Sequence, residues 1–310
     1  MPLSAKTQQF MTSLAANETL EAQGAFLSQS MKAGEVPQLH KIQDRTVPGP
    51  AGELPVRIYT PVESATPLPV VVFFHGGAFI VGDLDMYDRT VRLLSRETGY
   101  IFVSVQYRLA PTSKYPAAVE DSYAATAWVH ANAATLNADP ARFILMGDSS
   151  GGSLAATIAL MARDRGTPSI DFQVLIYPTT AHPAAYDEFE SWKTYNGYII
   201  TREGMEGAMS AYLPEPTSQF IDDPYVTFLK ATNFKGLAPA FIITAECDPL
   251  RDEAESCAAL LKTAGVPVVL SRYDGTIHGF LGLPFEAADV ARKQIAHVLK
   301  SYFKTGKVSM

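Results

Sequence analysis

The chain has 310 residues, of which 47% are hydrophobic and 18% are charged, and its formal net charge is −7. This length and apolar content allow one large α/β domain with a sizeable core, and they exclude a disordered chain, a collagen and a coiled coil. The net charge is negative and the sequence has no cluster of basic residues, so we expect that nucleic acid is not a partner.

The sequence carries no pattern of a membrane protein. The longest apolar run, residues 68–74, is far shorter than the roughly 20 residues needed to cross a bilayer, so we expect no stable membrane insertion. The first 20 residues lack the basic segment and continuous apolar segment of a secretory signal, which predicts a cytoplasmic location. Cys247 and Cys257 show no metal-ligand spacing, and we expect two reduced, buried thiols.

Short β-rich runs alternate with longer helical patterns along most of the chain, as in βαβ units. Several of the β-rich runs are apolar at every residue, which is typical of strands buried on both faces of a sheet. We therefore predict an α/β fold with a mainly parallel sheet flanked by helices on both faces. The predicted strands are residues 56–59, 70–74, 101–106, 143–146, 172–176, 241–244 and 266–271, and the predicted helices are residues 87–96, 117–134, 152–165, 253–264 and 286–303.

Two stretches interrupt this alternation. Residues 1–45 are predicted to be helical without a strand, and residues 183–215 contain aromatic residues, Met and a helical pattern at 202–212. We expect both stretches to pack together as a helical cap over the carboxyl ends of the strands, where ligands bind in open α/β sheets. The core would then comprise residues 46–182 and 216–310. The alternative is that both stretches are peripheral helices that only cover the core.

The sequence GDSSGG at residues 147–152 follows a predicted strand and begins a predicted helix. This is the G-x-S-x-G motif in the strand–turn–helix context of a nucleophile elbow. Glycine at 147 and at 151 would relieve the crowding of a tight turn, so that Ser149 presents its hydroxyl at the edge of the sheet. The sequence thus predicts Ser149 as a nucleophile.

The sequence HGGA at residues 75–78 comes directly after another predicted strand. Small residues at this position allow the backbone N–H groups of Gly76, Gly77 and Ala78, together with that of Ser150, to form an oxyanion hole. The glycine spacings of nucleotide-binding loops are absent, so neither nucleotide binding nor any other cofactor is predicted.

Asp248 and His278 each follow a predicted strand near the C-terminus. The carboxyl ends of parallel strands lie at one edge of a sheet, so both side chains can converge on Ser149. The order Ser, Asp, His is the one expected for this elbow, and the three residues are the predicted catalytic triad. Asp252 is the alternative acid. The remaining histidines have no paired spacing, so no metal site is predicted.

With these motifs the chain resembles the hormone-sensitive-lipase-type carboxylesterases of the α/β-hydrolase superfamily. The resemblance extends from about residue 56 to the C-terminus. Besides the elbow and the HGGA loop, it includes YRLAP at 107–111, YPAA at 115–118, DPLRDE at 248–253 and HGF at 278–280. It implies an α/β-hydrolase fold with a helical cap, and hydrolysis of short- to medium-chain carboxylic acid esters by water through a Ser-His-Asp acyl-enzyme.

The chain departs from the family pattern at two positions. Ala78 stands where the family most often has a third glycine, and its Cβ is expected to narrow the oxyanion hole. Ser150 stands where alanine is usual, which should matter little because only its backbone N–H is needed. The resemblance also implies loops that admit bulky, even tertiary, alcohol esters, and a homodimer is common among relatives.

Two other functions stay open at this point. One is an amidase or arylacetamide-type deacetylase, because the same triad cleaves amides. The other is a non-catalytic small-molecule receptor, although receptor-type relatives lack the histidine that His278 supplies here. Among neighbouring residues, we expect His75 to stabilise its loop by hydrogen bonds, Asp148 to be a structural carboxylate, and Arg108 to pair with Asp252.

Overall fold

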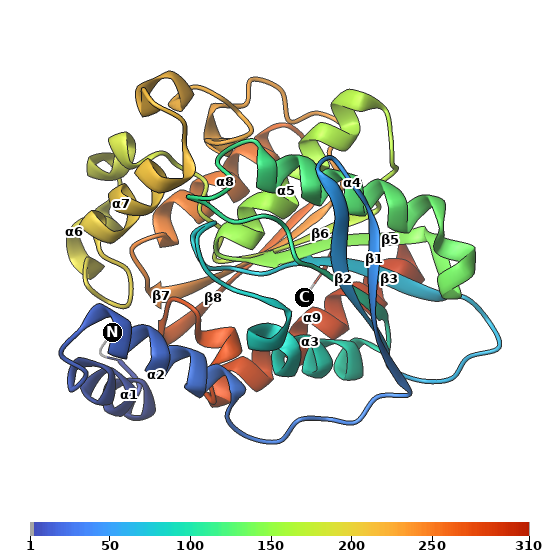
Figure 1. Ribbon diagram of the computed structural model, residues 1–310, viewed down its shortest axis with the longest axis horizontal. Helices are drawn as coiled ribbons and strands as arrows, with labels where there is room; N and C mark the ends of the chain where they lie inside the picture. Colours follow the sequence, from blue (N-terminus) through green and yellow to red (C-terminus); the bar gives the residue numbers. More distant parts are fainter. Residues whose placement is uncertain (1–2, 310) are drawn as a thin grey trace.

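The computed structural model describes residues 3–309, the side chain of Leu20 excepted (Figure 1). Within this range a single sheet has the strand order β1-β2-β4-β3-β5-β6-β7-β8. The neighbouring pairs β1–β2 and β2–β4 are antiparallel, and all the remaining neighbouring pairs are parallel. The strands are β1 (Lys41–Gly49), β2 (Gly52–Thr60), β3 (Leu68–Phe74), β4 (Ile101–Val105), β5 (Ala138–Asp148), β6 (Phe172–Ile176), β7 (Ala240–Cys247) and β8 (Val268–Ile277).

Helices cover both faces of the sheet (Figure 1). Side chains of α4, α5 and α8 belong to the core on one face, and side chains of α3 and α9 belong to the core on the other. The helices are α1 (Ala5–Ala15), α2 (Leu20–Lys32), α3 (Leu84–Thr98), α4 (Ala117–Ala131), α5 (Ser150–Arg165), α6 (Glu190–Tyr195), α7 (Arg202–Tyr212), α8 (Arg251–Thr263) and α9 (Glu286–Thr305), and short 3₁₀ turns are η1 (Ala133–Leu136), η2 (Pro183–Glu188), η3 (Thr217–Phe220), η4 (Phe228–Lys230) and η5 (Phe280–Gly282).

The alternation of side chains along β3 shows how both cores form. Val72 and Phe74 point to the face covered by α4 and α5, and Val71 and Phe73 point to the face covered by α3 and α9. All four side chains are fully buried. A strand that is apolar at every position is stable only where both of its faces are covered, which is why such runs identified the central strands in the sequence.

The predicted parallel sheet with helices on both faces is confirmed, but the prediction that residues 1–45 contain no strand is wrong. β1 begins at Lys41 and pairs with β2 in a hairpin at the edge of the sheet. Within β1 only Val47 is fully buried, so backbone pairing rather than apolar burial holds this strand. The helix predicted at 202–212 coincides with α7.

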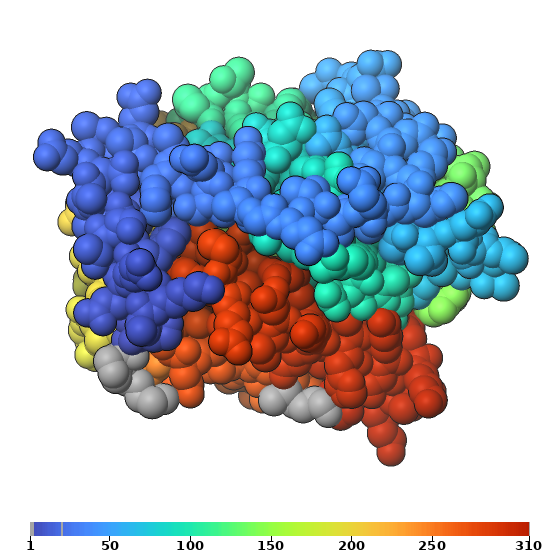
Figure 2. All heavy atoms as spheres, turned by 90° about the horizontal axis from the view of Figure 1, so that it is seen from below, coloured from blue at the N-terminus to red at the C-terminus, as the bar shows by residue number. Residues whose placement is uncertain are grey.

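The two segments outside the α/β alternation lie at the end of the molecule where the arrowheads of β7 and β8 end (Figure 1). The ring of Phe10 in α1 packs edge-on against Phe285, with 5.4 Å between centroids, and lies 5.3 Å from Phe26 of α2. Figure 2 shows the N-terminal segment lying against the C-terminal part of the chain on this face. No helix within the described range is long and apolar enough to cross a membrane.

Candidate active site

Ser149 occupies a sharp turn between β5 and α5. Its φ of 54° lies in the left-handed region, and its N–H donates to the carbonyl of Ile176 at 2.8 Å. A Cβ on Gly147 would lie 2.2 Å from the carbonyl oxygen of Gly151, and a Cβ on Gly151 would lie 2.0 Å from that of Phe74. Both glycines are therefore required by the close approach of backbone to the turn, as a nucleophile elbow demands.

The structure brings Ser149, His278 and Asp248 into one hydrogen-bonded chain. His278 Nε2 lies 2.9 Å from Ser149 Oγ, and His278 Nδ1 lies 2.7 Å from Asp248 Oδ2. Because a carboxylate only accepts hydrogen bonds, we assign the ring proton to Nδ1, which leaves Nε2 free to accept the serine hydroxyl proton. Asp248 is fully buried, whereas Ser149 remains partly exposed. This arrangement is competent for nucleophilic catalysis.

The order of the strands explains why these three residues meet. Asp248 follows β7 and His278 follows the neighbouring β8, while β6 separates them from β5 and Ser149. At the end of β6 the fully buried ring of Tyr177 packs against the imidazole of His278, with 4.7 Å between ring centroids. Asp248 also accepts the N–H of Leu250 at 2.9 Å, which fixes its carboxylate.

Residues 76–79 lie beside the elbow because β3 is the neighbour of β5. Gly77 has a φ of 120°, and a Cβ there would lie 2.1 Å from the carbonyl oxygen of Val81. Ala78 and Phe79 also have positive φ, at 54° and 64°. A turn this strained is a sparsely populated conformation that the surrounding contacts must hold in place.

Three of the four predicted oxyanion donors have backbone N–H groups without a protein acceptor among residues 3–309, namely Gly77, Ala78 and Ser150. The prediction for Gly76 differs from what the structure shows. Its N–H donates to Asp148 Oδ1 and to Tyr87 Oη, each at 3.0 Å. The N–H of Gly76 is therefore occupied and does not point to an oxyanion.

His75 and Asp148 are both buried behind this loop. His75 Nδ1 lies 2.7 Å from the carbonyl oxygen of Gly76, and its ring stacks on that of Tyr107 at 4.3 Å. Burial lowers the pKa of His75 to about 4, so the ring is neutral and donates from Nδ1. Burial raises the pKa of Asp148 to about 6, against the opposing effect of its bond from Tyr87. Within residues 3–309, no three His, Cys, Asp or Glu side chains are grouped so that they could hold a metal ion.

A pocket of about 340 Å³ adjoins the oxyanion loop at Ala78. Met11 and Leu14 of α1 line one part of it, and Met205 and Ala208 of α7 line another. Both segments outside the α/β alternation thus contribute apolar side chains to one cavity next to the predicted site. Apolar pockets with few polar groups are typical of small-molecule sites.

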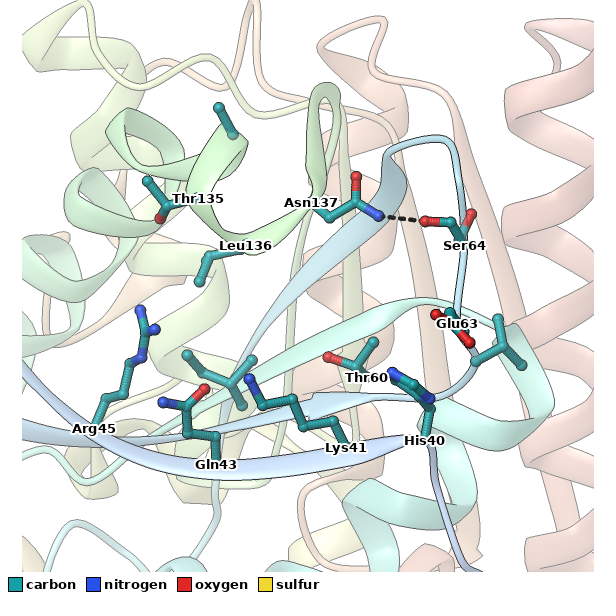
Figure 3. Close-up of a pocket in the computed structure, with 13 residues that line it drawn as sticks. His40, Lys41, Gln43, Arg45, Thr60, Glu63, Ser64, Thr135, Leu136 and Asn137 are labelled. Atoms are coloured by element: carbon teal, nitrogen blue, oxygen red, sulfur yellow. Dashed lines mark hydrogen bonds between the residues drawn. The ribbon is translucent and has the colours of Figure 1, made fainter.

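Another hollow, of about 300 Å³, lies at the opposite edge of the sheet (Figure 3). Lys41 and Arg45 of β1 line it, together with the segments that precede β3 and β5, where Asn137 donates to the carbonyl of Ser64. These segments are at the amino ends of the parallel strands, whereas Ser149 is at a carboxyl end. This hollow is therefore separate from the serine, histidine and aspartate.

The expected pair of Arg108 and Asp252 does not form. Arg108 instead makes a two-pronged contact with Asp121 of α4, from Nε and Nη2 at 2.8 Å each. Asp252 accepts the N–H of Ser191 at 2.8 Å and pairs with Arg251. The structure thus places Asp248, and not Asp252, in contact with the histidine.

Glu253 is a buried acidic residue whose position the sequence did not reveal. Its carboxyl accepts the N–H groups of Thr180 and Ala181, at 2.7 and 3.2 Å, and that of the Trp192 indole at 3.3 Å. Burial raises its pKa to about 8. It joins α8 to the segment after β6 and to α6. The only sequence signal was its place as the last residue of DPLRDE, directly after the alternative acid Asp252.

Comparisons with known proteins show the family to which the chain belongs. A family described as alpha/beta hydrolase fold matches residues 71–282. Two relatives from Mycobacterium tuberculosis are the carboxylic ester hydrolase LipN, 40% identical over 87% of this chain and 72% of its own, and the carboxylesterase NlhH, 39% identical over 88% and 85%.

Among solved structures, a hyperthermophilic esterase from the archaeon Pyrobaculum calidifontis superimposes with a TM-score of 0.89. It is 39% identical in sequence, and the match covers 98% of this chain and 99% of that one. The chain belongs to the hormone-sensitive-lipase-type carboxylesterases of the α/β-hydrolase superfamily.

Proposed function

We propose that the chain is a serine carboxylesterase in which Ser149, His278 and Asp248 hydrolyse carboxylic acid esters through an acyl-enzyme. Ser149 Oγ attacks the ester carbonyl while His278 Nε2 takes its proton, and the protonated ring then gives that proton to the departing alcohol. Water repeats the cycle on the acyl-enzyme and releases the acid. Asp248 keeps the ring in the required tautomer and stabilises its charged form. The observation that carries the proposal is the unbroken contact from Ser149 Oγ to Asp248.

The N–H groups of Gly77, Ala78 and Ser150 would bind the oxyanion of the tetrahedral intermediate. Two observations support this assignment: none of the three N–H groups has a protein acceptor among the described residues, and the loop adjoins the elbow. The amino end of α5 adds the positive end of a helix dipole at the same place.

Kinetics of triad variants test this mechanism. Ser149→Ala or His278→Ala should lower kcat by up to about 10⁶-fold, because triad members act as a unit. Asp248→Asn should lower kcat by about 10⁴-fold, because the amide favours the wrong tautomer. Asp252→Asn is the matched control and should retain most of the activity. A Ser149→Ala enzyme as active as the wild type, or an Asp252→Asn loss as large as that of Asp248→Asn, would refute the assignment.

For the substrate we propose esters with short to medium acyl chains. The support is the size of the apolar pocket beside Ala78, which holds about 340 Å³, and the carboxylesterase names of the relatives. The sequence predicted a cap from residues 1–45 and 183–215; since β1 begins at Lys41, we further propose that residues 3–40 and 183–215 act as the cap, because both line this pocket. A cytoplasmic location and a homodimer stay predictions, which fractionation and light scattering would test.

The alternatives raised by the sequence are less well supported. Relatives named as ester hydrolases favour an esterase over an amidase, and comparing an ester with the matching anilide would separate the two. A receptor without catalysis would not need the complete contact between serine, histidine and aspartate that the structure contains.

A further inference from the structure

Asp148 directly connects the nucleophile elbow to the oxyanion loop. It is the residue before Ser149, and each of its two carboxylate oxygens accepts a hydrogen bond from a different group. Oδ1 accepts the N–H of Gly76, and Oδ2 accepts the hydroxyl of Tyr87, both at 3.0 Å. The same Tyr87 hydroxyl also accepts the N–H of Gly76 at 3.0 Å. The three groups therefore form a closed triangle between β5, the loop after β3, and α3.

This triangle is buried and is held from several sides. Asp148 is 6% exposed and Tyr87 is 5% exposed. Tyr87 is held by α3, which begins where Asp83 Oδ1 accepts the N–H of Met86 at 2.7 Å. A Cβ on Gly76 would lie 2.9 Å from both Asp148 Oδ2 and the Tyr87 hydroxyl, so only glycine allows this approach.

The next two residues of the loop depend on this anchor. Gly77 and Ala78, whose N–H groups are the proposed oxyanion donors, both have left-handed backbone conformations. The peptide groups of Gly76 are fixed on both sides, since its N–H is held by Asp148 and its carbonyl oxygen lies 2.7 Å from His75 Nδ1. A donor contributes to catalysis only when it is aimed in advance at the developing charge.

We propose that Asp148 is a positioning residue that sets the oxyanion donors of Gly77 and Ala78 relative to Ser149, through the N–H of Gly76. This inference rests on the proposed function, because it assumes attack by Ser149. Asp148 does not touch the substrate and transfers no proton. A negative charge near a developing oxyanion opposes catalysis in itself, so the value of this carboxylate must lie in the geometry that it imposes.

Because the negative charge of Asp148 opposes stabilisation of the oxyanion, removing that charge distinguishes a positioning role from a simple effect of charge. Asp148→Asn removes the charge but keeps the shape, and it replaces the charge-assisted bond to Gly76 by a weaker neutral one. If only charge mattered, the variant would stabilise the oxyanion better than the wild type. If position matters, the variant must stabilise the oxyanion less well, because the N–H groups of Gly77 and Ala78 are no longer held towards it. Its affinity for the uncharged ester should stay the same.

The experiment compares kcat, KM and the affinity for an aryl trifluoromethyl ketone in the full-length enzyme. Ser149 Oγ adds to the carbonyl carbon of this probe, its proton passes to His278, and the carbonyl oxygen becomes an oxyanion without a leaving group. We expect Asp148→Asn to lower kcat and the probe affinity each by about 10- to 100-fold, which is below the 10²–10³ lost with a whole donor, while KM changes by less than about threefold.

Two further variants keep the test decisive. Tyr87→Phe retains the bond from Gly76 to Asp148 and should show the same pattern at about 3- to 10-fold, even if Asp148→Asn does not fold. Asp171→Asn is the matched control, because Asp171 also accepts a backbone N–H, that of Phe143 in the middle of β5 at 2.9 Å; it should leave kcat and probe affinity unchanged.

Unchanged kcat and probe affinity in both Asp148→Asn and Tyr87→Phe would overturn the inference, as would a tighter complex with the probe in Asp148→Asn. An equal loss in Asp171→Asn would also overturn it, because the effect would then belong to any carboxylate that accepts a backbone N–H. Ser149→Ala is run alongside. If that variant is fully active, the proposed function itself fails, and the two failures are thereby distinguished.

Discussion

Single residues at the site adopt backbone conformations that few residue types accept. Ser149 and Ala78 both have a φ of 54°, and Gly77 has a φ of 120°. A left-handed conformation costs an L-residue about 1–2 kcal/mol, whereas glycine adopts it freely. The site therefore stores strain at non-glycine positions, which include Ser149, Ala78 and Phe79, and the contacts around the elbow and the loop hold it there.

A pair of substitutions in the loop tests this strain. Gly77→Ala should destabilise the protein by about 2–5 kcal/mol, because the new Cβ would lie 2.1 Å from the Val81 carbonyl in a left-handed backbone. Ala78→Gly should stay within about 1 kcal/mol of the wild type, since relief of strain offsets the added freedom of the unfolded chain. Urea denaturation measures both. Equal destabilisation by the two substitutions would show that the loop is not held as described.

Most site residues were predictable because each was signalled by local sequence. Gly147 and Gly151 flank a serine after an apolar strand, and Asp248 and His278 follow apolar strands in the expected order. The role of Gly76 was not predictable in this way. Its N–H is occupied because Asp148 and Tyr87, which are distant from it in sequence, approach it in the fold. No local pattern encodes that approach.

The elements position the site through neighbouring strands. β3 and β5 bring the oxyanion loop beside the elbow, and β7 and β8 bring Asp248 beside His278. The segment that contains α7 is tied to the same loop, because Tyr212 of α7 stacks on Phe79 with 4.1 Å between ring centroids. Apolar runs predicted the central strands, but β1 was missed because its stability comes from pairing with β2 rather than from an apolar face.

Filling the pocket from either segment should shift the preference for acyl chain length. Ala208→Phe in α7 and Ala15→Phe in α1 each place a ring in the cavity of about 340 Å³, so kcat/KM for p-nitrophenyl octanoate should fall at least 10-fold relative to that for the acetate. Glu206→Phe is the control, since Glu206 is an exposed residue of α7 that does not line the pocket.

The wild-type series from C2 to C16 provides the reference for these variants. We expect maximal turnover at short to medium chains. A maximum at C16, or a chain-length profile that neither ring alters, would contradict the assignment of this pocket to the acyl chain.

At the scale of the whole molecule, buried ionisable groups link stability to pH. Burial raises the pKa of Glu253 to about 8, so the folded protein retains a proton that the unfolded chain releases near its ordinary value. The stability that this group contributes is therefore fully present below that ordinary value and is lost as pH rises towards 8. The buried His75, whose pKa is lowered to about 4, has the opposite dependence between pH 4 and its ordinary value.

Glu253→Gln isolates the contribution of Glu253. The amide does not titrate, so the free energy of unfolding of the variant minus that of the wild type should increase with pH between about 5 and 8, by at most about 1.4 kcal/mol per pH unit. Urea denaturation at each pH measures this difference, in which the effect of His75 cancels. A difference that does not depend on pH would show that Glu253 is ionised throughout this range.

The fold of the whole molecule was largely predictable, because alternating strands and helices with apolar cores define a parallel α/β sheet. The sequence led to the expectation that the segments containing α1 and α7 pack together over the carboxyl ends of the strands, but which of their side chains line the cavity beside Ala78 was not predictable. Such docking depends on side-chain shape across surfaces that carry no periodic signal.

Covalent labelling shows directly whether Ser149 is the nucleophile. The enzyme is treated with a p-nitrophenyl alkylphosphonate, and the modified residue is located by peptide mass spectrometry. We expect one phosphonyl group per chain, on Ser149, with activity lost in proportion, and almost no labelling of His278→Ala. Stoichiometric labelling at another residue, or full activity with Ser149 modified, would contradict it.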